Sequence, residues 1–334
     1  MWQRMNVLMG QETWLGVGFV ALVIIMLVLD LGLLNRKAHT PSYREAATWS
    51  AVWVTLALCF GGVIFWQMGA VKGTEFLTGY VIELSLSVDN LFVFLLIFGY
   101  FKVPAKYQHR VLFWGVMGAL VMRVTIILLG SALIERFHFI LYLFGAFLIY
   151  TGIKMLFQED EEIDPENSAI IKVMTRFVPI TRRYEGEKFF IIENGKRTGT
   201  LLFLVLVIVE VSDLVFAVDS IPAIFGITRD PFIIYTSNVF AIMGLRSLFF
   251  LLAGVVEKFH YLKIGLAIVL TLIGVKMLVE PFVVGTIITK NMMIFGSLIA
   301  VALVLSSSVI ASVIWPIEME SEADVATSSD DQDS

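Results

Sequence analysis

Six carboxylates lie within or at the end of segments that are otherwise apolar enough to cross a membrane. They are Asp30, Glu83, Asp89, Glu210, Asp213 and Asp219. A charged side chain at the centre of a bilayer costs about 2.5 to 3.5 kcal/mol on insertion scales, so such residues are rare unless they have a function. We therefore expect these acids to form an intramembrane site.

The side chains beside these acids indicate what the site would bind. Asn90 follows Asp89 and Ser220 follows Asp219, so the candidate ligands are oxygen atoms. Oxygen ligands suit Mg²⁺, Ca²⁺ and Mn²⁺, whereas Zn²⁺ and Cu⁺ recruit imidazole and sulfur. The four histidines lie in predicted loops or at helix starts, and we expect the single cysteine, Cys59, to be a small buried apolar residue. The pattern predicts a site for a hard divalent cation.

Helix geometry divides the acids between faces. Glu210 and Asp213 are three residues apart and share one face of a helix, as a bridging pair would. Asp219 then points about 180° away from Glu210 on a straight helix. Either the distant acids face another polar partner, or the helices unwind beside them and expose carbonyl groups. Pro222 favours a break in the sixth apolar segment.

Two arginines within apolar segments, Arg123 and Arg246, could balance part of the negative charge. Six acids against two arginines leave a charge of −4, an excess whose sign suits a divalent cation. We predict that both arginines pair with the acids of the empty site and limit the repulsion that raises carboxylate pKa values. The alternative is that acids and arginines form closed ion pairs that only stabilise the bundle.

The elements that carry these residues are predicted to be transmembrane helices. The chain has 334 residues, 58% of them hydrophobic and 16% charged, with a mean hydropathy of +0.86. A helix needs about 20 apolar residues to cross the hydrocarbon core. The qualifying stretches lie near 13–34, 49–68, 74–100, 110–133, 138–157, 200–226, 231–256, 261–280 and 288–315. The predicted fold class is therefore an all-α, polytopic helical bundle of about nine spans.

An internal repeat organises the predicted spans. Aligning residues 133–156 with 255–278 without gaps gives eight identities in 24 positions. We infer inverted three-helix repeats, spans 3–5 and spans 6–8, which enter the membrane from opposite sides and suit alternating access. The chain then divides into the following regions: an N-terminal transmembrane half (13–157), a cytoplasmic loop (158–199), the second repeat (200–280), a last transmembrane helix (281–316) and an acidic disordered tail (317–334).

The positions of lysine and arginine predict the orientation. One set of alternate loops holds 15 basic residues and the opposite set holds five. Basic loops stay in the cytoplasm. This places the N-terminus outside and the C-terminus in the cytoplasm. The loop 158–199 is expected to be mainly a solvated linker, with a small hairpin at residues 188–197.

Several function classes are not supported. The sequence contains no phosphate-binding loop, no ligand set for a prosthetic group and no arrangement of serine, cysteine or histidine for hydrolysis. We expect a protein that is not an enzyme, has no bound cofactor and does not bind nucleic acid. Its expected partners are membrane lipid, a divalent metal ion and protons.

At these motifs the sequence resembles the TerC family of integral membrane proteins, most closely its Alx branch. The matching segments are TGYVIELSLSVDNLFVF at 78–94, VEVSDLVFAVDSIPAIF at 209–225, DPFIIYTSNVFAIMGLRSLFFLLAG at 230–254 and GVKML at 274–278. The likeness covers residues of about 15 to 285, and the last span and the tail look less similar to the family.

The resemblance implies a bacterial inner-membrane protein that exports Mn²⁺, with related roles in tellurite resistance and in the response to alkaline pH. It assigns the acidic motif to Glu83, Asp89, Asn90, Glu210, Asp213, Asp219 and Ser220. We therefore predict a secondary exporter of Mn²⁺, coupled by proton antiport, with Asp30 as an accessory residue. The alternatives are a membrane scaffold that does not transport, in which the loop 158–199 docks other proteins, and a redox modulator.

Overall fold

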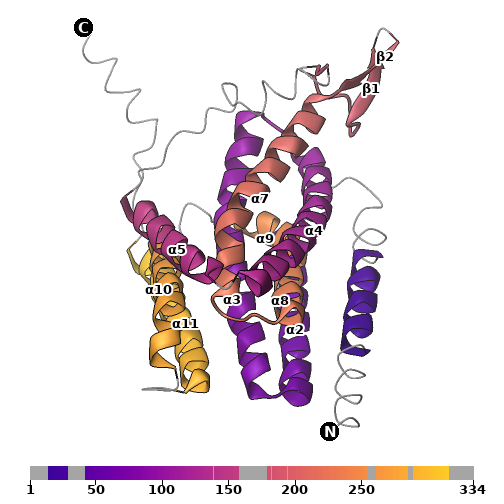
Figure 1. Cartoon of the computed structure of the whole chain (residues 1–334). Helices are drawn as coiled ribbons and strands as arrows, with labels where there is room; N and C mark the ends of the chain where they lie inside the picture. The colour runs from indigo at the N-terminus through magenta and orange to yellow at the C-terminus, as the bar shows by residue number, and fades with distance from the viewer. Residues whose placement is uncertain are drawn as a thin grey trace, which may run out of the picture.

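The computed structural model is an all-α protein with one small β-hairpin (Figure 1). It describes residues 14–28, 42–137, 139–157, 179–181, 183–193, 195–253, 261–284 and 289–315. For Asp89, Phe92, Asp219 and Lys290 it describes the backbone alone. Asp30, the acidic start of the predicted loop and the predicted tail 317–334 lie outside the described residues.

The N-terminal half consists mainly of long apolar helices. Its elements are the helix Trp14–Val28, α2 (Tyr43–Met68), α3 (Ala70–Tyr100), α4 (Ala105–Arg136) and α5 (Ile140–Phe157). Helices α2 and α3 are joined through Gly69 alone, whose φ of 88° is a conformation that glycine adopts without strain.

The C-terminal half begins with the hairpin and continues as helices. Its elements are β1 (Phe190–Glu193), β2 (Lys196–Gly199), α7 (Leu201–Phe225), α8 (Pro231–Met243), α9 (Leu245–Leu252), α10 (Leu262–Val283) and α11 (Lys290–Ile314). Polar side chains cap the N-termini of three of these helices: Thr200 on α7, Asp230 on α8 and Thr289 on α11.

The helices are long and apolar enough for a multi-pass membrane protein. Seven of them could each cross a membrane, and the pair α8 and α9, bent by 40° at Gly244, could form an eighth span. The shorter apolar helix Trp14–Val28 coincides with the first predicted stretch. The described helices therefore confirm an all-α polytopic bundle.

The predicted break at Pro222 is wrong. Helix α7 continues through Pro222 to Phe225, and α3 is likewise a single helix of 31 residues. Pro222 lies in the last turn of α7, so the missing N–H removes only one bond, to the carbonyl of Val218. The end of α7 is also held by Lys276 on α10, which donates a hydrogen bond of 2.9 Å to the Gly226 carbonyl.

Helices α5 and α10 pack against each other at backbone distance. A Cβ on Gly145 would lie 3.0 Å from the Gly274 carbonyl, and one on Gly152 would lie 2.6 Å from the Ala267 carbonyl. Because the residue numbers rise on α5 as they fall on α10, the two helices run antiparallel. In the ungapped alignment above, Gly152 corresponds to Gly274 and Gly145 to Ala267. The two close contacts are therefore each other's counterparts under the repeat.

The hairpin is packed onto the turn between α3 and α4. The Tyr184 hydroxyl donates a hydrogen bond of 2.7 Å to the Phe101 carbonyl, and Arg110 forms an ion pair of 3.1 Å with Glu187. The Arg110 guanidinium also lies over the Phe189 ring. The expected hairpin is thus present, but the described residues 183–193 and 195–200 form a docked structure instead of a solvated linker.

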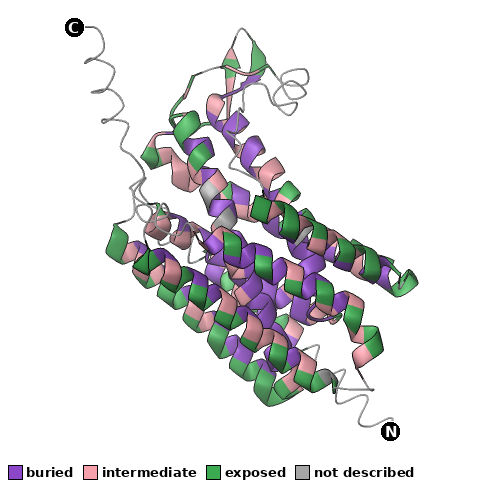
Figure 2. Cartoon of the chain, turned by 90° about the vertical axis from the view of Figure 1, so that its left-hand side faces the viewer, coloured by how far each residue is buried: buried purple, intermediate pink, exposed green. Residues whose placement is uncertain are grey.

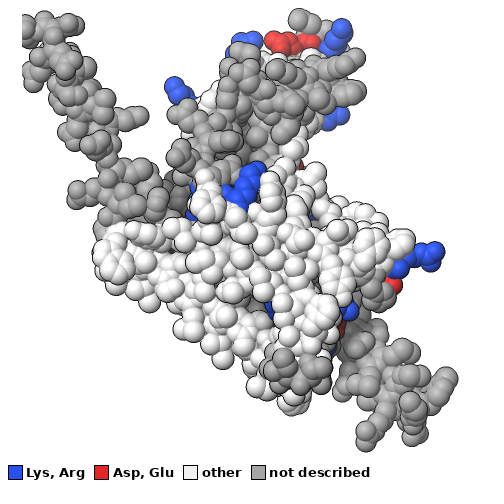
Figure 3. Space-filling view, turned by 60° about the vertical axis from the view of Figure 1, so that its left-hand side comes forward, with Lys and Arg blue, Asp and Glu red and all other residues white. Residues whose placement is uncertain are grey.

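The outer surface of the helices is apolar, as contact with lipid requires. Figure 2 shows buried residues on the inward faces of the helices and exposed residues on their outward faces. The face in Figure 3 is largely uncharged, and charged side chains of both signs gather at the hairpin end. Cys59 on α2 is exposed, so its expected burial is wrong. An apolar environment in the sequence does not imply burial when the outside of the protein faces lipid.

Candidate functional site

Arg123 on α4 is the centre of a buried polar network. Its side chain is 2% exposed, and its Nη1 group donates hydrogen bonds to Glu83 Oε1, to Asn238 Oδ1 at 2.9 Å and to Ser220 Oγ at 3.2 Å. The Nη2 atom lies 3.6 Å from Asp213 Oδ1. Four helices, α3, α4, α7 and α8, each contribute at least one side chain to this network.

Asn238 connects the two charged groups of the network. Its Nδ2 group donates to Glu83 Oε2 at 3.2 Å while its Oδ1 atom accepts from Arg123. Both oxygen atoms of Glu83 are therefore hydrogen-bonded, and the carboxylate is 1% exposed. The sequence prediction did not include Asn238. The signal that could have identified it is a polar residue in the otherwise apolar segment 231–243.

The network is not saturated with hydrogen bonds. Among the described residues, Asp213 Oδ2, Arg123 Nε and Arg123 Nη2 have no hydrogen-bond partner, although all three atoms are buried. Two carboxylates against one guanidinium give the network a formal charge of −1. A buried charge with unused hydrogen-bonding capacity is costly in a medium of low dielectric constant. This arrangement could accept a further positively charged or polar group.

A polar stripe continues along α3 from Glu83. Ser87 and Asn90 follow at spacings of four and three residues, so all three side chains share one face of the continuous helix. They are 1%, 1% and 4% exposed, and neither Ser87 Oγ nor Asn90 Nδ2 has a hydrogen-bond partner within the described part of the chain. The predicted residue Asn90 is thus buried about 10 Å along α3 from Glu83.

Glu210 lies one turn before Asp213 on α7, on the side that faces α4. The carboxylate rests against the backbone of Gly118, where any larger residue would collide with it. The shared face predicted for Glu210 and Asp213 is consistent with this position. Because α7 is continuous, positions 213 and 219 are about 240° apart around the helix axis. The sequence left two alternatives for the distant acids, a second polar partner or an unwound helix. The continuous helix excludes the unwound one.

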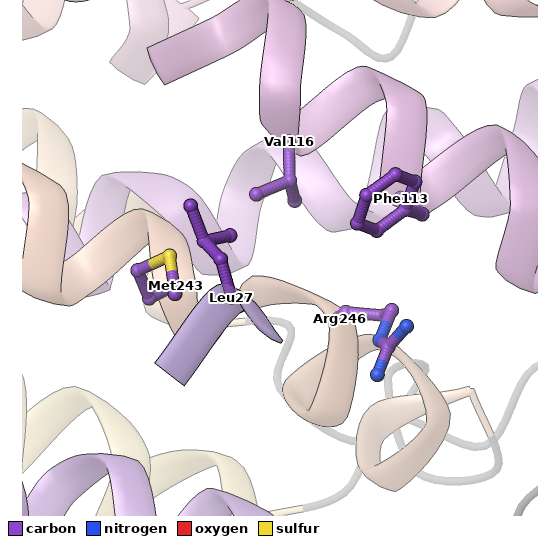
Figure 4. A pocket seen from close by; sticks show the side chains of 5 residues that line it. All are labelled: Leu27, Phe113, Val116, Met243 and Arg246. Carbon is purple, nitrogen blue, oxygen red and sulfur yellow. The ribbon is translucent and has the colours of Figure 1, made fainter. Parts of the chain in front are cut away.

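Arg246 occupies a different level of the bundle from Arg123. It lines a small cavity together with Leu27, Phe113, Val116 and Met243, with room for about one water molecule (Figure 4). Val116 is seven residues from Arg123 on α4, so the cavity lies about 10 Å along that helix from the network.

Apolar clusters enclose the network from both ends. On α4 one cluster ends at Leu120 and the other begins at Ile127, with Arg123 between them. On α7 the same two clusters end at Val209 and begin at Ala217, with Asp213 between them. On these two neighbouring helices Arg123 and Asp213 therefore lie between residues of the two apolar clusters. This geometry gives an occluded polar site in the interior of the bundle.

The described residues contain no group of three or more histidine, cysteine, aspartate or glutamate side chains that could hold a metal ion. The Arg123 guanidinium contacts both Glu83 and Asp213, the two buried carboxylates of the network. A cation would therefore have to replace the guanidinium.

The model of the "Integral membrane protein TerC family" matches residues 68–319. The chain belongs to the TerC family. The match includes α11, so the expectation that the last span is less similar to the family is wrong.

The TerC-family relatives align over most of their length. An uncharacterized membrane protein of Myxococcus xanthus is 51% identical over 297 residues, which cover 89% of this chain and 91% of the relative. A protein of Escherichia coli strain K12 named "Putative membrane-bound redox modulator Alx" is 47% identical over 291 residues, or 84% of this chain and 91% of the relative. An uncharacterized membrane protein of Rickettsia bellii is 43% identical over 265 residues. No solved structure matches the chain.

Proposed function

We propose that this TerC-family protein is a secondary transporter that exports a divalent metal ion through the buried network around Arg123. The proposed cargo is Mn²⁺. The observation that carries the proposal is the burial of two carboxylates, Glu83 and Asp213, that contact one guanidinium in the interior of the bundle. Closed structural ion pairs alone would not require unused hydrogen-bonding atoms at the same place.

The charge of the network supports a divalent cargo. With Arg123 in place the formal charge is −1, and when the guanidinium leaves, Glu83 and Asp213 leave −2, which one divalent cation neutralises. The available ligands are carboxylate, amide and hydroxyl oxygens, which suit Mn²⁺, Mg²⁺ and Ca²⁺. Arg123 acts in this proposal as a tethered cation that occupies the site when the cargo is absent. Arg246, whose predicted pairing with the acids is retained here as a proposal, lies at the neighbouring cavity.

Proton antiport would couple export to an energy source. Carboxylates buried in an apolar layer bind either a cation or protons at low energetic cost, but they are costly when charged and alone. Protonation on the outer side would release the metal ion, and deprotonation on the cytoplasmic side would prepare the site for the next one. Glu210, which rests against Gly118 beside Asp213, is positioned to take part in this exchange.

Inverted repeats would provide alternating access. The first repeat would comprise α3 to α5 and the second α7 to α10. The antiparallel packing of α5 and α10 supports this proposal, because its two close glycine contacts are related by the repeat alignment. The equal spacing from Glu83 to Asn90 and from Asp213 to Ser220 supports it as well. We further propose an inner-membrane location with the N-terminus outside, which puts the hairpin in the cytoplasm.

The decisive experiment is uptake of Mn²⁺ into inverted vesicles that contain the purified protein, with and without an imposed pH gradient. Replacing Asp213 by Asn keeps the shape of the side chain and removes one charge, and we expect it to reduce gradient-dependent uptake by at least about tenfold. The matched control is Glu193→Gln, which removes a carboxylate charge from the exposed hairpin. Full uptake by a folded Asp213→Asn protein would refute the proposal.

A non-transporting scaffold is the second candidate. One observation favours it: residues 183–200 are folded against the α3–α4 turn and present a defined surface. The same vesicle assay separates the candidates, because a scaffold gives no Mn²⁺ uptake. A redox role, which the name of the E. coli relative states for that protein, would make function depend on Cys59. That side chain lies on the exposed side of α2, away from the buried network.

A further inference from the structure

A second polar cluster closes one end of the interface between α3 and α8. Lys72 on α3 forms ion pairs with Glu75 at 3.0 Å and with Asp230 at 2.8 Å. Thr228 donates a hydrogen bond of 2.7 Å to the same Glu75 oxygen atom, Oε2. The cluster therefore fastens the turn between α7 and α8 to the first turns of α3.

The cluster and the network around Arg123 lie on the same pair of helices. Glu75 precedes Glu83 by eight residues on α3, and Asp230 precedes Asn238 by eight residues on α8. Eight residues correspond to about 12 Å along a helix. Lys72 joins the first pair, and a hydrogen bond joins Asn238 to Glu83. Helices α3 and α8 therefore run parallel between these points, and each begins at the cluster and reaches the network two turns later.

The interface between the two polar contacts is narrow at one point. A Cβ on Gly79 would lie 3.0 Å from Ser237 Oγ, so α3 and α8 approach each other closely at a position where α3 has no side chain. Ser237 is 0% exposed. Separating the ends of α3 and α8 at the cluster would therefore uncover Ser237 first and the Glu83–Asn238 contact next.

The cluster lies at the boundary between solvent and the interior. The side chain of Lys72 is 31% exposed and that of Asp230 is 21% exposed, whereas that of Glu75 is 3% exposed. Ions and water can therefore reach the outer partners, but the third partner is enclosed. When the turn moves, water can therefore replace the partners of Lys72 in its ion pairs. A closure made only of apolar side chains would have no such contact with solvent.

We propose that Lys72, together with Glu75 and Asp230, forms a gate that closes the path from the α7–α8 end of the bundle to the network around Arg123. When the gate is broken, the turn 226–230 separates from α3 and opens the interface at Ser237. The gate depends on the proposed function in one respect: it takes the network around Arg123 as the transport site to which the gate controls access. With the proposed orientation, this is the outer gate.

The two oxygen atoms of Asp230 have separate roles, so its charge can be removed without removing its helix cap. Its Oδ1 atom caps α8 by accepting from the backbone N–H groups of Phe232 and Ile233, while its Oδ2 atom binds Lys72. Asparagine caps helices as well as aspartate does. Asp230→Asn therefore keeps the start of α8 and removes the charge that holds Lys72.

The experiment measures access to Ser237 without any metal ion. In a Cys59→Ser background, Ser237→Cys supplies a single thiol, and its reaction with a membrane-impermeant methanethiosulfonate is followed in vesicles of each orientation. We expect slow labelling when the gate is intact. Lys72→Gln and Asp230→Asn should each raise the rate by about tenfold from the α7–α8 side, as expected when one strong contact of a two-state element is lost.

Two controls separate a gate from general loosening. Lys72→Arg keeps the positive charge and should keep labelling slow. Arg110→Gln breaks the ion pair with Glu187 at the opposite end and should also leave it slow. Unchanged rates in Asp230→Asn, or an equal rise in Arg110→Gln, would overturn the gate. If labelling rises as expected but vesicles take up no Mn²⁺, the gate stands and the proposed function fails.

Discussion

Replacing Asn238 by leucine tests whether this uncharged residue holds the two charged groups of the network together. The substitution keeps the approximate volume but removes the donor to Glu83 at 3.2 Å and the acceptor from Arg123 at 2.9 Å. A hydrogen bond to a charged group contributes about 1.5 to 3 kcal/mol. Arg123 keeps Glu83 and Ser220 as acceptors, so we expect a total loss near the lower limit for two bonds, about 3 kcal/mol.

The loss is measurable as a shift in thermal unfolding of the detergent-solubilised protein. Domains of 150 to 250 residues lose about 2 to 4 °C per kcal/mol, and a larger chain lies at the low end, so we expect a decrease of about 6 °C. The matched control is Thr236→Val, on the same helix and also 0% exposed. The Thr236 hydroxyl donates only to carbonyls of its own helix, so its removal should cost less than about 1 kcal/mol.

A double-mutant cycle completes the test. If Asn238 acts through Glu83, then Asn238→Leu should cost much less in a Glu83→Gln background, with a coupling energy of about 1 to 3 kcal/mol. Equal losses for Asn238→Leu and Thr236→Val would refute the reasoning, because the charged partners would then contribute nothing. Full additivity in the cycle would show that Asn238 does not act through Glu83.

Two further predictions concern the α4–α7 contact and the hairpin. Gly118→Ala should displace the Glu210 carboxylate, lower the stability by about 1 to 3 kcal/mol and reduce Mn²⁺ uptake. The control is Gly296→Ala, where a Cβ meets nothing within 4 Å, and it should change neither stability nor uptake. Burial raises the pKa of Tyr184 to about 12 from an ordinary value near 10. Its hydrogen bond to Phe101 therefore contributes fully below about pH 10 and is lost as the pH rises through 12. The tyrosinate absorbance of the native protein minus that of Tyr184→Phe should show this titration, and a step near pH 10 would contradict it.

The sequence predicted the helices because lipid imposes a simple length requirement on apolar segments. It also predicted that buried acids and Arg123 would matter, since charges within spans need partners. Glu83, Asp213 and Ser220 do converge on Arg123. These residues gather because burying any one of them without a polar partner would be energetically costly.

The remaining features depend on helix rotation and packing, which charge and hydropathy do not specify. Asn238 carries no charge, so its position in the segment 231–243 marks it as polar but does not indicate its contacts with Glu83 and Arg123. Arg246 has the same charge as Arg123 but lies about two turns away along α4, at the cavity. Pro222 was expected to break α7, but a proline in the last turn affects only one hydrogen bond. Cys59 is exposed because the outer surface of this bundle is as apolar as its core.

The length of α3 has a mechanical consequence for the hairpin. At 1.5 Å per residue its 31 residues extend over about 46 Å, whereas the hydrocarbon core is about 30 Å thick. A rod that pivots at its middle moves each end by about 4 Å for a 10° tilt. Tyr184 attaches the hairpin to the end of this lever at Phe101, Arg110 attaches it to the start of α4, and Leu201 joins the hairpin directly to α7. The hairpin therefore links the ends of α3 and α7. A tilt of α3 relative to α7 must either deform the hairpin or detach it from α3.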